Sequence, residues 1–193
     1  MRVVLASASP RRKELFKKIC PSFEILPAKG EEKSGGTSPE EVVEELAKAK
    51  AKEVFFSLDE GEKIVLGADT VVVSEGKILG KPKDANEAKK MLFALSGKVH
   101  FVLTGVSFFY SDGKSVFEKT THAKTEVWFE ELTASFIDEY IASGSPLDKA
   151  GAYGIQDGGL VKEIKGSYSN VVGLPVELCQ TLWAEITKKG VGV

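Results

Sequence analysis

The chain has 193 residues, of which 42% are hydrophobic and 28% are charged, and its formal net charge is −2 at neutral pH. This composition excludes a disordered chain, and the near balance of charges excludes a strong general attraction to nucleic acid or to an anionic membrane. The two cysteines, Cys20 and Cys179, lie far apart, so the sequence predicts two buried thiols and neither a disulfide framework nor a metal motif.

Residues 1–193 are expected to form one domain, which can have two small lobes, because this length can bury a sizeable core without cross-links. The apolar stretch at the N-terminus ends at Ser7 and is followed at once by Pro10 and two arginines, a pattern typical of a buried strand and not of a signal peptide. Later segments are too polar for a membrane span, which needs roughly 18 apolar residues. We therefore expect a cytoplasmic protein without a membrane or nucleic-acid partner.

Strands and helices alternate along the chain. They are predicted from apolar periodicity, from glycine-containing turns and from helix-capping residues such as Ser9, Asp84 and Thr133, with Thr37 or Ser38 as a further cap. In chain order the predicted elements are a strand over 3–6, a helix over 9–19, a strand over 23–26, a helix over 39–55, a strand over 64–73, a helix over 84–95, strands over 99–110 and 115–129, a helix over 133–142, a strand over 160–164 and a helix over 175–188. The long hairpin in the middle of the chain favours an α/β fold with a mixed sheet over a purely parallel one.

Asp69 is the strongest single candidate for catalysis. It interrupts residues 64–73, the most hydrophobic run of the chain, whose β-branched residues predict a central strand. An unpaired carboxylate there would cost several kcal/mol, so Asp69 is expected to lie at the strand end or to bind a cation. The alternative is a structural aspartate that is hydrogen-bonded to a neighbouring loop.

Residues 7–12, with the sequence SASPRR, combine features that favour a bound phosphate. They lie where a strand passes into a helix, and the free backbone N–H groups of a helix N-terminus attract anions. The side chains of Ser7, Arg11 and Arg12 add hydroxyl and guanidinium donors, and the planar guanidinium group matches phosphate oxygens. A capped surface helix with solvated arginines is the alternative.

Charged residues elsewhere could complete such a site. Glu31 and Glu32 lie in a glycine-flanked loop and could hold a magnesium ion with Asp69, because hard cations bind carboxylate oxygens, although loop glutamates are more often solvated. Lys81 stands before a proline that stiffens its turn. Lys50 falls late in a lysine-rich helix, for which a solvent-exposed face is the simpler explanation.

Residues 148–156, with the sequence DKAGAYGIQ, place small residues around one aromatic ring and one amide. This composition suits the close approach of a flat base, whose edge the amide of Gln156 could read through a donor and an acceptor, with a tight turn as the alternative. His100 and His122 are isolated in strand patterns and are interpreted as structural. The Walker A, GxSxG and HExxH motifs do not occur in the sequence. The residues thus indicate nucleotide or phosphate binding with a metal and leave the reaction open.

Six motifs, in the same order and over almost the full chain, resemble those of the Maf family. They are SASPRR (7–12), GADT (67–70), GKP (80–82), LSG (95–97), DKAGAYGIQ (148–156) and VGLP (172–175). The resemblance implies a fold related to the inosine triphosphate pyrophosphatases, an elongated mixed β-sheet with flanking helices and two lobes around a central nucleotide cleft. It also implies hydrolysis of a nucleoside triphosphate to the monophosphate and diphosphate, a divalent cation (Mg²⁺, Mn²⁺ or Co²⁺) as cofactor, and a homodimer.

The resemblance also implies roles for individual residues. Asp69 matches the catalytic carboxylate of the family, described as the proton acceptor, and Glu32 matches a second carboxylate associated with the metal. The positions linked to the polyphosphate, or lying in the same loop, are matched by Ser7, Arg11, Arg12, Lys50 and Lys81. We therefore expect Asp69, Glu32, Lys50 and Lys81 to be catalytic and the two carboxylates to hold the metal.

Within the family, the branch that acts on dTTP and UTP is the most similar to this chain. The motif over 148–156 is intact, and Arg11, Thr70 and Gln156 match the positions tied to that substrate choice. A 7-methyl-GTP or ITP/XTP pyrophosphatase is the alternative from the same reaction class. The family has also been associated with septum formation and arrest of cell division, so a nucleotide sensor without enzymatic activity competes with an enzyme that clears surplus nucleotides.

One departure from the family pattern concerns the base pocket. Asp157 follows Gln156 where the family usually has glycine, and the segment from there to Ile164 is shortened. This departure bears on the shape of the pocket that holds the base and does not affect the residues expected at the phosphates.

Overall fold

The computed structural model describes residues 1–190, and the chain divides into two compact units. Unit 1 comprises Met1–Asp69, Thr104–Ala123 and the C-terminal segment from Gly173. Unit 2 comprises Thr70–Leu103 and Lys124–Val172. Three of the four points at which the chain passes between the units lie within long strands, so neither unit is a continuous stretch of sequence.

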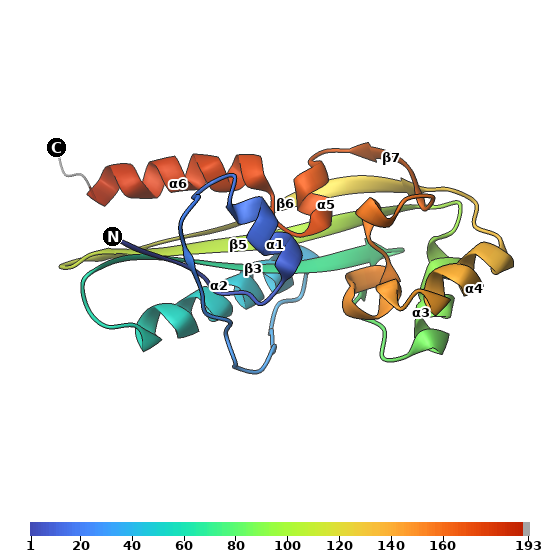
Figure 1. Ribbon diagram of the computed structural model, residues 1–193, viewed down its shortest axis with the longest axis horizontal. Coiled ribbons are helices and arrows are strands. Elements are labelled where there is room, and N and C mark those ends of the chain that lie inside the picture. Colours follow the sequence, from blue (N-terminus) through green and yellow to red (C-terminus); the bar gives the residue numbers. More distant parts are fainter. Residues whose placement is uncertain (191–193) are drawn as a thin grey trace. The chain divides into compact units, whose positions relative to one another are not determined.

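The strands of the described residues form one mixed sheet (Figure 1). They are β1 (Arg2–Leu5), β2 (Glu24–Ile25), β3 (Glu62–Ser74), β4 (Lys77–Leu79), β5 (Val99–Asp112), β6 (Val116–Phe129) and β7 (Val161–Lys165). Their order is β2-β1-β3-β5-β6-β7, and β4 pairs with β3 outside this path. β1 runs parallel to β2 and β3, whereas β4 and β7 run antiparallel to β3 and β6. The predicted α/β class with a mixed sheet is confirmed.

The four helices for which a capping residue was predicted begin directly after it. They are α1 (Pro10–Phe16), α2 (Pro39–Ser57), α3 (Ala85–Leu95), α4 (Ala134–Ala142), α5 (Tyr168–Val172) and α6 (Val176–Gly190). The side chains of Ser9, Ser38, Asp84 and Thr133 each accept a hydrogen bond from the backbone N–H three residues further on. Ser38, and not Thr37, is therefore the cap of α2, and its capping box is completed by the third residue of the helix.

Several local predictions differ from the structure. The first helix ends at Phe16 and continues as a turn, so it is shorter than the predicted helix that reached residue 19. The glycine-rich motif over 148–156 was not assigned a helix, but short 3₁₀ helices cover Ala150–Ala152 and Ile155–Asp157, and another precedes them over Ser145–Asp148. Helix α5 was not predicted, because five residues are too few to show helical periodicity.

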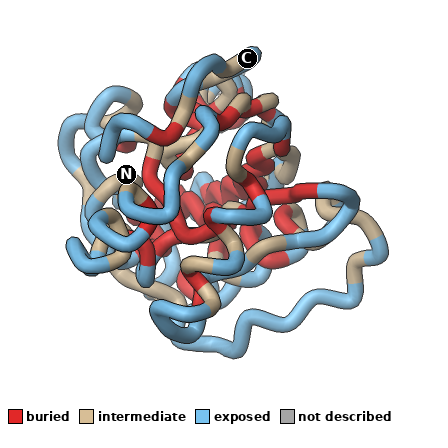
Figure 2. Tube along the Cα trace, turned by 90° about the vertical axis from the view of Figure 1, so that its right-hand side faces the viewer, coloured by how far each residue is buried: buried red, intermediate tan, exposed pale blue. Residues whose placement is uncertain are grey.

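Each unit has its own apolar core. In unit 1, Val4 of β1 packs with Ala51 of α2 and Phe109 of β5. In unit 2, Leu92 of α3 packs in one cluster with Ile137 of α4. Figure 2 shows buried residues in the interior of the trace and exposed residues along the connecting loops. The strands are thus held by helices that place an apolar stripe against them.

The cysteines differ in exposure. Cys179 is buried, as predicted, whereas Cys20 is only partly buried, so the prediction of a buried thiol was wrong for Cys20. Burial raises the pKa of the Cys179 thiol. Among the described residues, no helix combines the length and the apolar character that crossing a membrane requires.

The two histidines have structural surroundings. His100 of β5 is 0% exposed, and its Nε2 lies 2.7 Å from the hydroxyl of Tyr153. The ring of Phe129 packs edge-on against it, with ring centroids 4.8 Å apart. His122 places Nδ1 at 2.7 Å from Oε1 of Glu44. Burial lowers the pKa of His100 to about 4.

The burial of His100 predicts a pH-dependent loss of stability. Since its pKa falls from 6.5 in the unfolded chain to about 4 in the folded protein, the unfolded chain binds a proton first as the pH falls. Keeping His100 neutral therefore lowers the free energy of unfolding little above pH 6.5, and by an increasing amount as the pH falls from 6.5 towards 4. We expect this group to remove about 2 kcal/mol from the free energy of unfolding between about pH 7.5 and pH 5.

Urea unfolding of the wild type and of His100→Gln at both pH values checks this prediction. The amide can still bond to Tyr153 but does not titrate, so the variant is expected to lack this part of the pH dependence. The same pH dependence in both proteins would contradict the assignment.

Candidate active site

Asp69 of β3 forms an ion pair with Lys50 of α2. The Lys50 ammonium lies 2.6 Å from Oδ1 of Asp69 and 2.7 Å from Oε1 of Glu32, so that one cation bridges two carboxylates. The side chains of Asp69 and Lys50 are 11% and 16% exposed, which contradicts the expectation of a solvent-exposed lysine. The carboxylate within the apolar strand thus has the cationic partner that its burial requires.

Helix α2 reaches Asp69 because it packs directly on the backbone of β3. A Cβ atom at Gly67 would lie 2.3 Å from the carbonyl oxygen of Ala47 and 2.6 Å from the backbone nitrogen of Ala51. Only glycine permits so close an approach. Since residues two apart in a strand share a face, Asp69 points to the same side as Gly67 and therefore towards α2. Lys50 lies one turn beyond Ala47 on the helix, where it meets that carboxylate.

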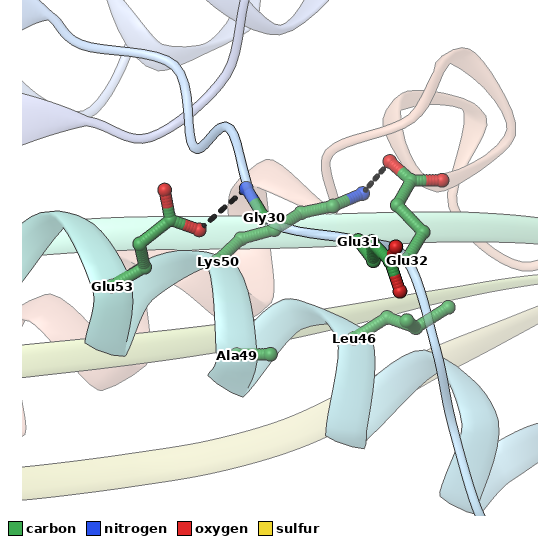
Figure 3. Close-up of a pocket in the computed structure, with 7 residues that line it drawn as sticks. All are labelled: Gly30, Glu31, Glu32, Leu46, Ala49, Lys50 and Glu53. Carbon is green, nitrogen blue, oxygen red and sulfur yellow. Dashed lines mark hydrogen bonds and ion pairs between the residues drawn. The ribbon is translucent and has the colours of Figure 1, made fainter.

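A pocket lies beside the bridging lysine (Figure 3). Residues 30–32 line it from the loop that precedes α2, and Leu46, Lys50 and Glu53 line it from the helix. Figure 3 shows the Lys50 side chain extending from α2 to meet Glu32 of the loop. The predicted acidic loop and the predicted lysine therefore meet at one site within unit 1.

Arg12 is held beside Ser7 at the junction of β1 and α1. Its Nη1 donates to Oγ of Ser7 at 3.4 Å, and its Nε donates to the carbonyl oxygen of Gly173 at 2.8 Å. The backbone N–H of Ser9 donates to the same Ser7 oxygen at 3.3 Å. Burial lowers the pKa of the Arg12 guanidinium, and the nearby charge of Asp69 opposes this shift. The two hydrogen bonds thus fix the orientation of the guanidinium, which interacts electrostatically with the carboxylate of Asp69.

Arg11 and Glu32 act electrostatically on the same guanidinium. The positive charge of Arg11 contributes to lowering the pKa of Arg12, after burial, and the carboxylate of Glu32 raises it. Direct contacts join the predicted residues of unit 1 in two sets, Ser7 with Arg12 and Lys50 with Asp69 and Glu32. The carboxylates of the second set and the charge of Arg11 act on the Arg12 guanidinium of the first.

The other predicted site residues, Thr70, Lys81 and Gln156, belong to unit 2. Thr70 lies in β3 and is partly buried, whereas Lys81 and Gln156 are exposed. The backbone N–H of Gly151 donates to the carbonyl oxygen of Gly80 at 3.0 Å. This bond ties the turn that carries Lys81 to the glycine-rich segment that carries Gln156.

Residues 2–186 match the protein family described as Maf-like protein. The chain belongs to the Maf family. A protein of Agathobacter rectalis named dTTP/UTP pyrophosphatase is 47% identical and covers 100% of this chain and 99% of its own length. Proteins of the same name from Thermotoga maritima and Bacillus cytotoxicus are 46% and 51% identical; the alignments cover 98% and 91% of this chain and 90% of each relative.

The fold of this Maf-family chain is similar to that of the Ham1 protein of Staphylococcus aureus. The TM-score is 0.51, and the alignment covers 96% of this chain and 99% of the other. Because the identity is only 15%, the likeness concerns the fold alone. It confirms the prediction of an α/β fold of the Ham1 type.

Asp157, the departure from the usual Maf glycine, is the centre of a hydrogen-bond network in unit 2. Its carboxylate accepts a bond from the hydroxyl of Tyr140 at 2.5 Å and another from Oγ of Ser145 at 2.7 Å. The ammonium of Lys149 lies 4.0 Å from the same oxygen. Burial, followed by the bond to Asp157, raises the pKa of Tyr140. Asp157 therefore holds its segment of the chain to Tyr140 and Ser145 by hydrogen bonds.

No pattern in the sequence indicates this network, which surrounds Gly154. A Cβ atom at Gly154 would lie 2.8 Å from the amide nitrogen of Gln156, 2.8 Å from Cε of Lys149 and 3.0 Å from the carboxylate of Asp157. Three side chains thus converge over one glycine. The amide of Gln156 and the carboxylate of Asp157 consequently lie on the same side of Gly154.

Asp69 and Glu32 are the two carboxylates of this site that could hold a metal ion. Within residues 1–190, no three His, Cys, Asp or Glu side chains gather into a ready-made metal site. Magnesium is usually held by one or two carboxylates, while water and substrate phosphates supply the other ligands. Two carboxylates that face one cation, the Lys50 ammonium, fit such an ion when a phosphate completes its ligands.

The contact between α2 and β3 predicts the effect of Gly67→Ala. The new methyl group would overlap the backbone of α2, so the helix must move away from the strand. We expect a loss of about 1–3 kcal/mol in the free energy of unfolding. Urea unfolding measures this loss. Gly80→Ala is the control, because a Cβ atom there meets nothing within 4 Å. Equal stability of the two variants would contradict the packing argument.

Proposed function

We propose that this Maf-family chain is a nucleoside triphosphate pyrophosphatase that hydrolyses dTTP and UTP to the monophosphate and diphosphate. The observation that carries the proposal is the Lys50 ammonium bridging Asp69 and Glu32, since it joins a cation and two carboxylates at one point. Relatives that are 46% to 51% identical and named dTTP/UTP pyrophosphatase support the reaction and the substrates.

The cationic side chains suit the triphosphate. Arg12 is fixed by its bonds to Ser7 and Gly173, so its planar fork is oriented before a phosphate arrives. Arg11 and Lys50 add positive charge within unit 1. When the bond between the α- and β-phosphates breaks, negative charge gathers on the leaving diphosphate, and fixed cations stabilise that charge. We assign the same role to Lys81 of unit 2.

Asp69 is the proposed proton acceptor for the attacking water. Together with Glu32 it would hold a divalent cation, Mg²⁺, Mn²⁺ or Co²⁺, which when bound polarises phosphate oxygens and makes water more acidic. Lys50 keeps the two carboxylates directed at one point. In this way the proton acceptor and the cationic groups are positioned before the substrate binds.

We assign recognition of the nucleobase to Gln156, Thr70 and Arg11. The amide of Gln156 offers one donor and one acceptor, which match the adjacent carbonyl and N–H groups of thymine or uracil. The network around Asp157 supports this role because it fixes the segment that carries Gln156. A 7-methyl-GTP or ITP/XTP pyrophosphatase would need a different fit at this amide.

Assembly, location and cellular role remain predictions. The Maf resemblance predicts a homodimer, and the sequence pattern, which is not that of a signal peptide or a membrane span, predicts a cytoplasmic protein. Removal of surplus or modified pyrimidine nucleotides follows from the proposed reaction. A link to septum formation or to arrest of cell division is compatible with it.

Diphosphate release from a panel of nucleotides tests the proposal. The panel contains dTTP, UTP, CTP, dATP, GTP, ITP and 7-methyl-GTP, each with magnesium, manganese or cobalt and with the metal chelated. We expect metal-dependent release that favours dTTP and UTP. Preference for ITP or 7-methyl-GTP would keep the reaction but contradict the role of Gln156, and no release from folded protein would favour a nucleotide sensor.

Asp69→Asn is the matched variant for this assay. The amide keeps the size of the side chain but cannot accept a proton, so turnover of dTTP should fall by about 10²–10⁴-fold while the fold is kept. Circular dichroism and nucleotide binding serve as controls. Turnover close to that of the wild type would rule out Asp69 as the base.

Asp157→Ala should change the part of the site that binds the nucleobase and leave the part that binds the phosphates intact. It removes the one carboxylate oxygen that accepts hydrogen bonds from the hydroxyls of both Tyr140 and Ser145, which loosens the segment that carries Gln156. We expect KM for dTTP and UTP to rise about two- to tenfold, the equivalent of one net hydrogen bond, with kcat changed less than twofold. Steady-state kinetics measure both constants. Asp138→Ala, on the exposed surface of α4, is the control, and a fall in kcat alone would contradict the assignment.

A further inference from the structure

The loop over 27–38 between β2 and α2 carries Glu32 and is fastened to the helix by a glutamate. Oε1 of Glu53 accepts a hydrogen bond from the backbone N–H of Lys29 at 2.7 Å, and Oε2 accepts one from Gly30 at 2.9 Å. Figure 3 shows the Glu53 side chain reaching from α2 to Gly30. One carboxylate therefore holds two consecutive residues of the loop.

A second glutamate of α2 fastens the other part of the loop. One oxygen of Glu45 accepts hydrogen bonds from Oγ of Ser34 at 2.5 Å, from the N–H of Gly35 at 3.0 Å and from the N–H of Gly36 at 3.1 Å. These bonds, first that of Ser34, lower the pKa of Glu45, which favours the ionised acceptor. Residues 31–33 thus lie between two points of attachment.

The attachment bears on the position of Glu32. Its side chain is 64% exposed, so packing contributes little to that position, which depends on the ion pair with Lys50 and on the path of the loop backbone. Glu53 and Lys50 lie three residues apart on α2 and therefore on neighbouring positions of one side of the helix. The helix side that fastens the loop is consequently the side that presents the ammonium to Glu32.

We infer that Glu53 is a positioning residue, which keeps Glu32 directed at Lys50 and Asp69 by holding the loop on α2. The inference rests on the proposed function, because it treats Glu32 as part of the site. Gly30 fits the same role. A Cβ atom there would lie 2.7 Å from Oε2 of Glu53 and would displace the carboxylate. Nothing in the reaction itself requires Glu53 to touch the substrate.

Glu53→Ala in the full-length protein tests the inference with three measurements. Hydrogen exchange followed by mass spectrometry reports on the amides of residues 29 and 30. Electron paramagnetic resonance of free Mn²⁺ without nucleotide measures binding of the metal by the protein, and diphosphate release from dTTP gives kcat and the half-saturating metal concentration. We expect faster exchange of these amides and metal binding weakened about 10–100-fold, the range for residues that orient a metal ligand.

Two further variants sharpen the test. Glu53→Gln keeps one carbonyl oxygen as acceptor, so its effects should fall between those of the wild type and Glu53→Ala. Gly30→Ala should reproduce part of the loss without changing Glu53. Glu60→Ala removes an exposed carboxylate from the turn after α2 and should leave all three measurements unchanged.

The outcomes separate the inference from the proposed function. Weakened metal binding with unchanged amide exchange would make Glu53 a direct ligand and overturn the positioning role. Faster exchange with wild-type metal binding would show that the attachment does not place Glu32, and would also overturn it. If the wild type releases no diphosphate from any nucleotide, the proposed function fails, while amide exchange and Mn²⁺ binding still decide the role of Glu53.

Discussion

The site depends on backbone contact between helix α2 and the sheet. Gly67 of β3 and Gly105 of β5 stand where a Cβ atom would lie 2.3 Å and 2.1 Å from carbonyl oxygens of the helix. Because no layer of side chains separates the two elements, Lys50 reaches a carboxylate that projects from the middle of an apolar strand. Burial of Asp69 is tolerable only with that partner, since a buried charge without a counter-ion is costly. The ion pair of Lys50 and Asp69 therefore depends on the two glycines, which allow the helix to lie directly on the sheet.

Features with a local signal could be predicted from the sequence, and features held by distant contacts could not. The helix caps were predicted because a cap is a hydrogen bond between a side chain and a backbone group three residues away. Helix α5 lacks such periodic information and is held by tertiary bonds, such as that from Nδ2 of Asn170 to the carbonyl oxygen of Val102 at 3.0 Å. The partial exposure of Cys20 likewise depends on packing that composition does not reveal.

The candidate site shows the same division. Asp69 could be found because a charge within a β-branched run conflicts with burial unless it has a partner. Lys50 was named only through the family resemblance, because α2 also carries Lys48 and Lys52 and the residue pattern does not say which ammonium faces the sheet. Glu53 leaves no motif at all, since it accepts hydrogen bonds from backbone groups 23 and 24 residues earlier in the chain. Backbone recognition is independent of side-chain type, so only the structure reveals it.

The two units differ in how they hold the groups assigned to the reaction, and this difference bears on substrate choice. In unit 1 the lysine and the aspartate are placed by a helix that touches strand backbone at glycine, so a change there shifts the whole cluster. In unit 2 the segment with Gln156 is held by single side-chain bonds from Tyr140 and Ser145 to Asp157, each worth about 1 kcal/mol. Such bonds can be exchanged one at a time without loss of the fold. On the proposed function, the base pocket can therefore change while the phosphate chemistry is kept, which agrees with the departure from the family pattern falling at Asp157 and not at the ion pair.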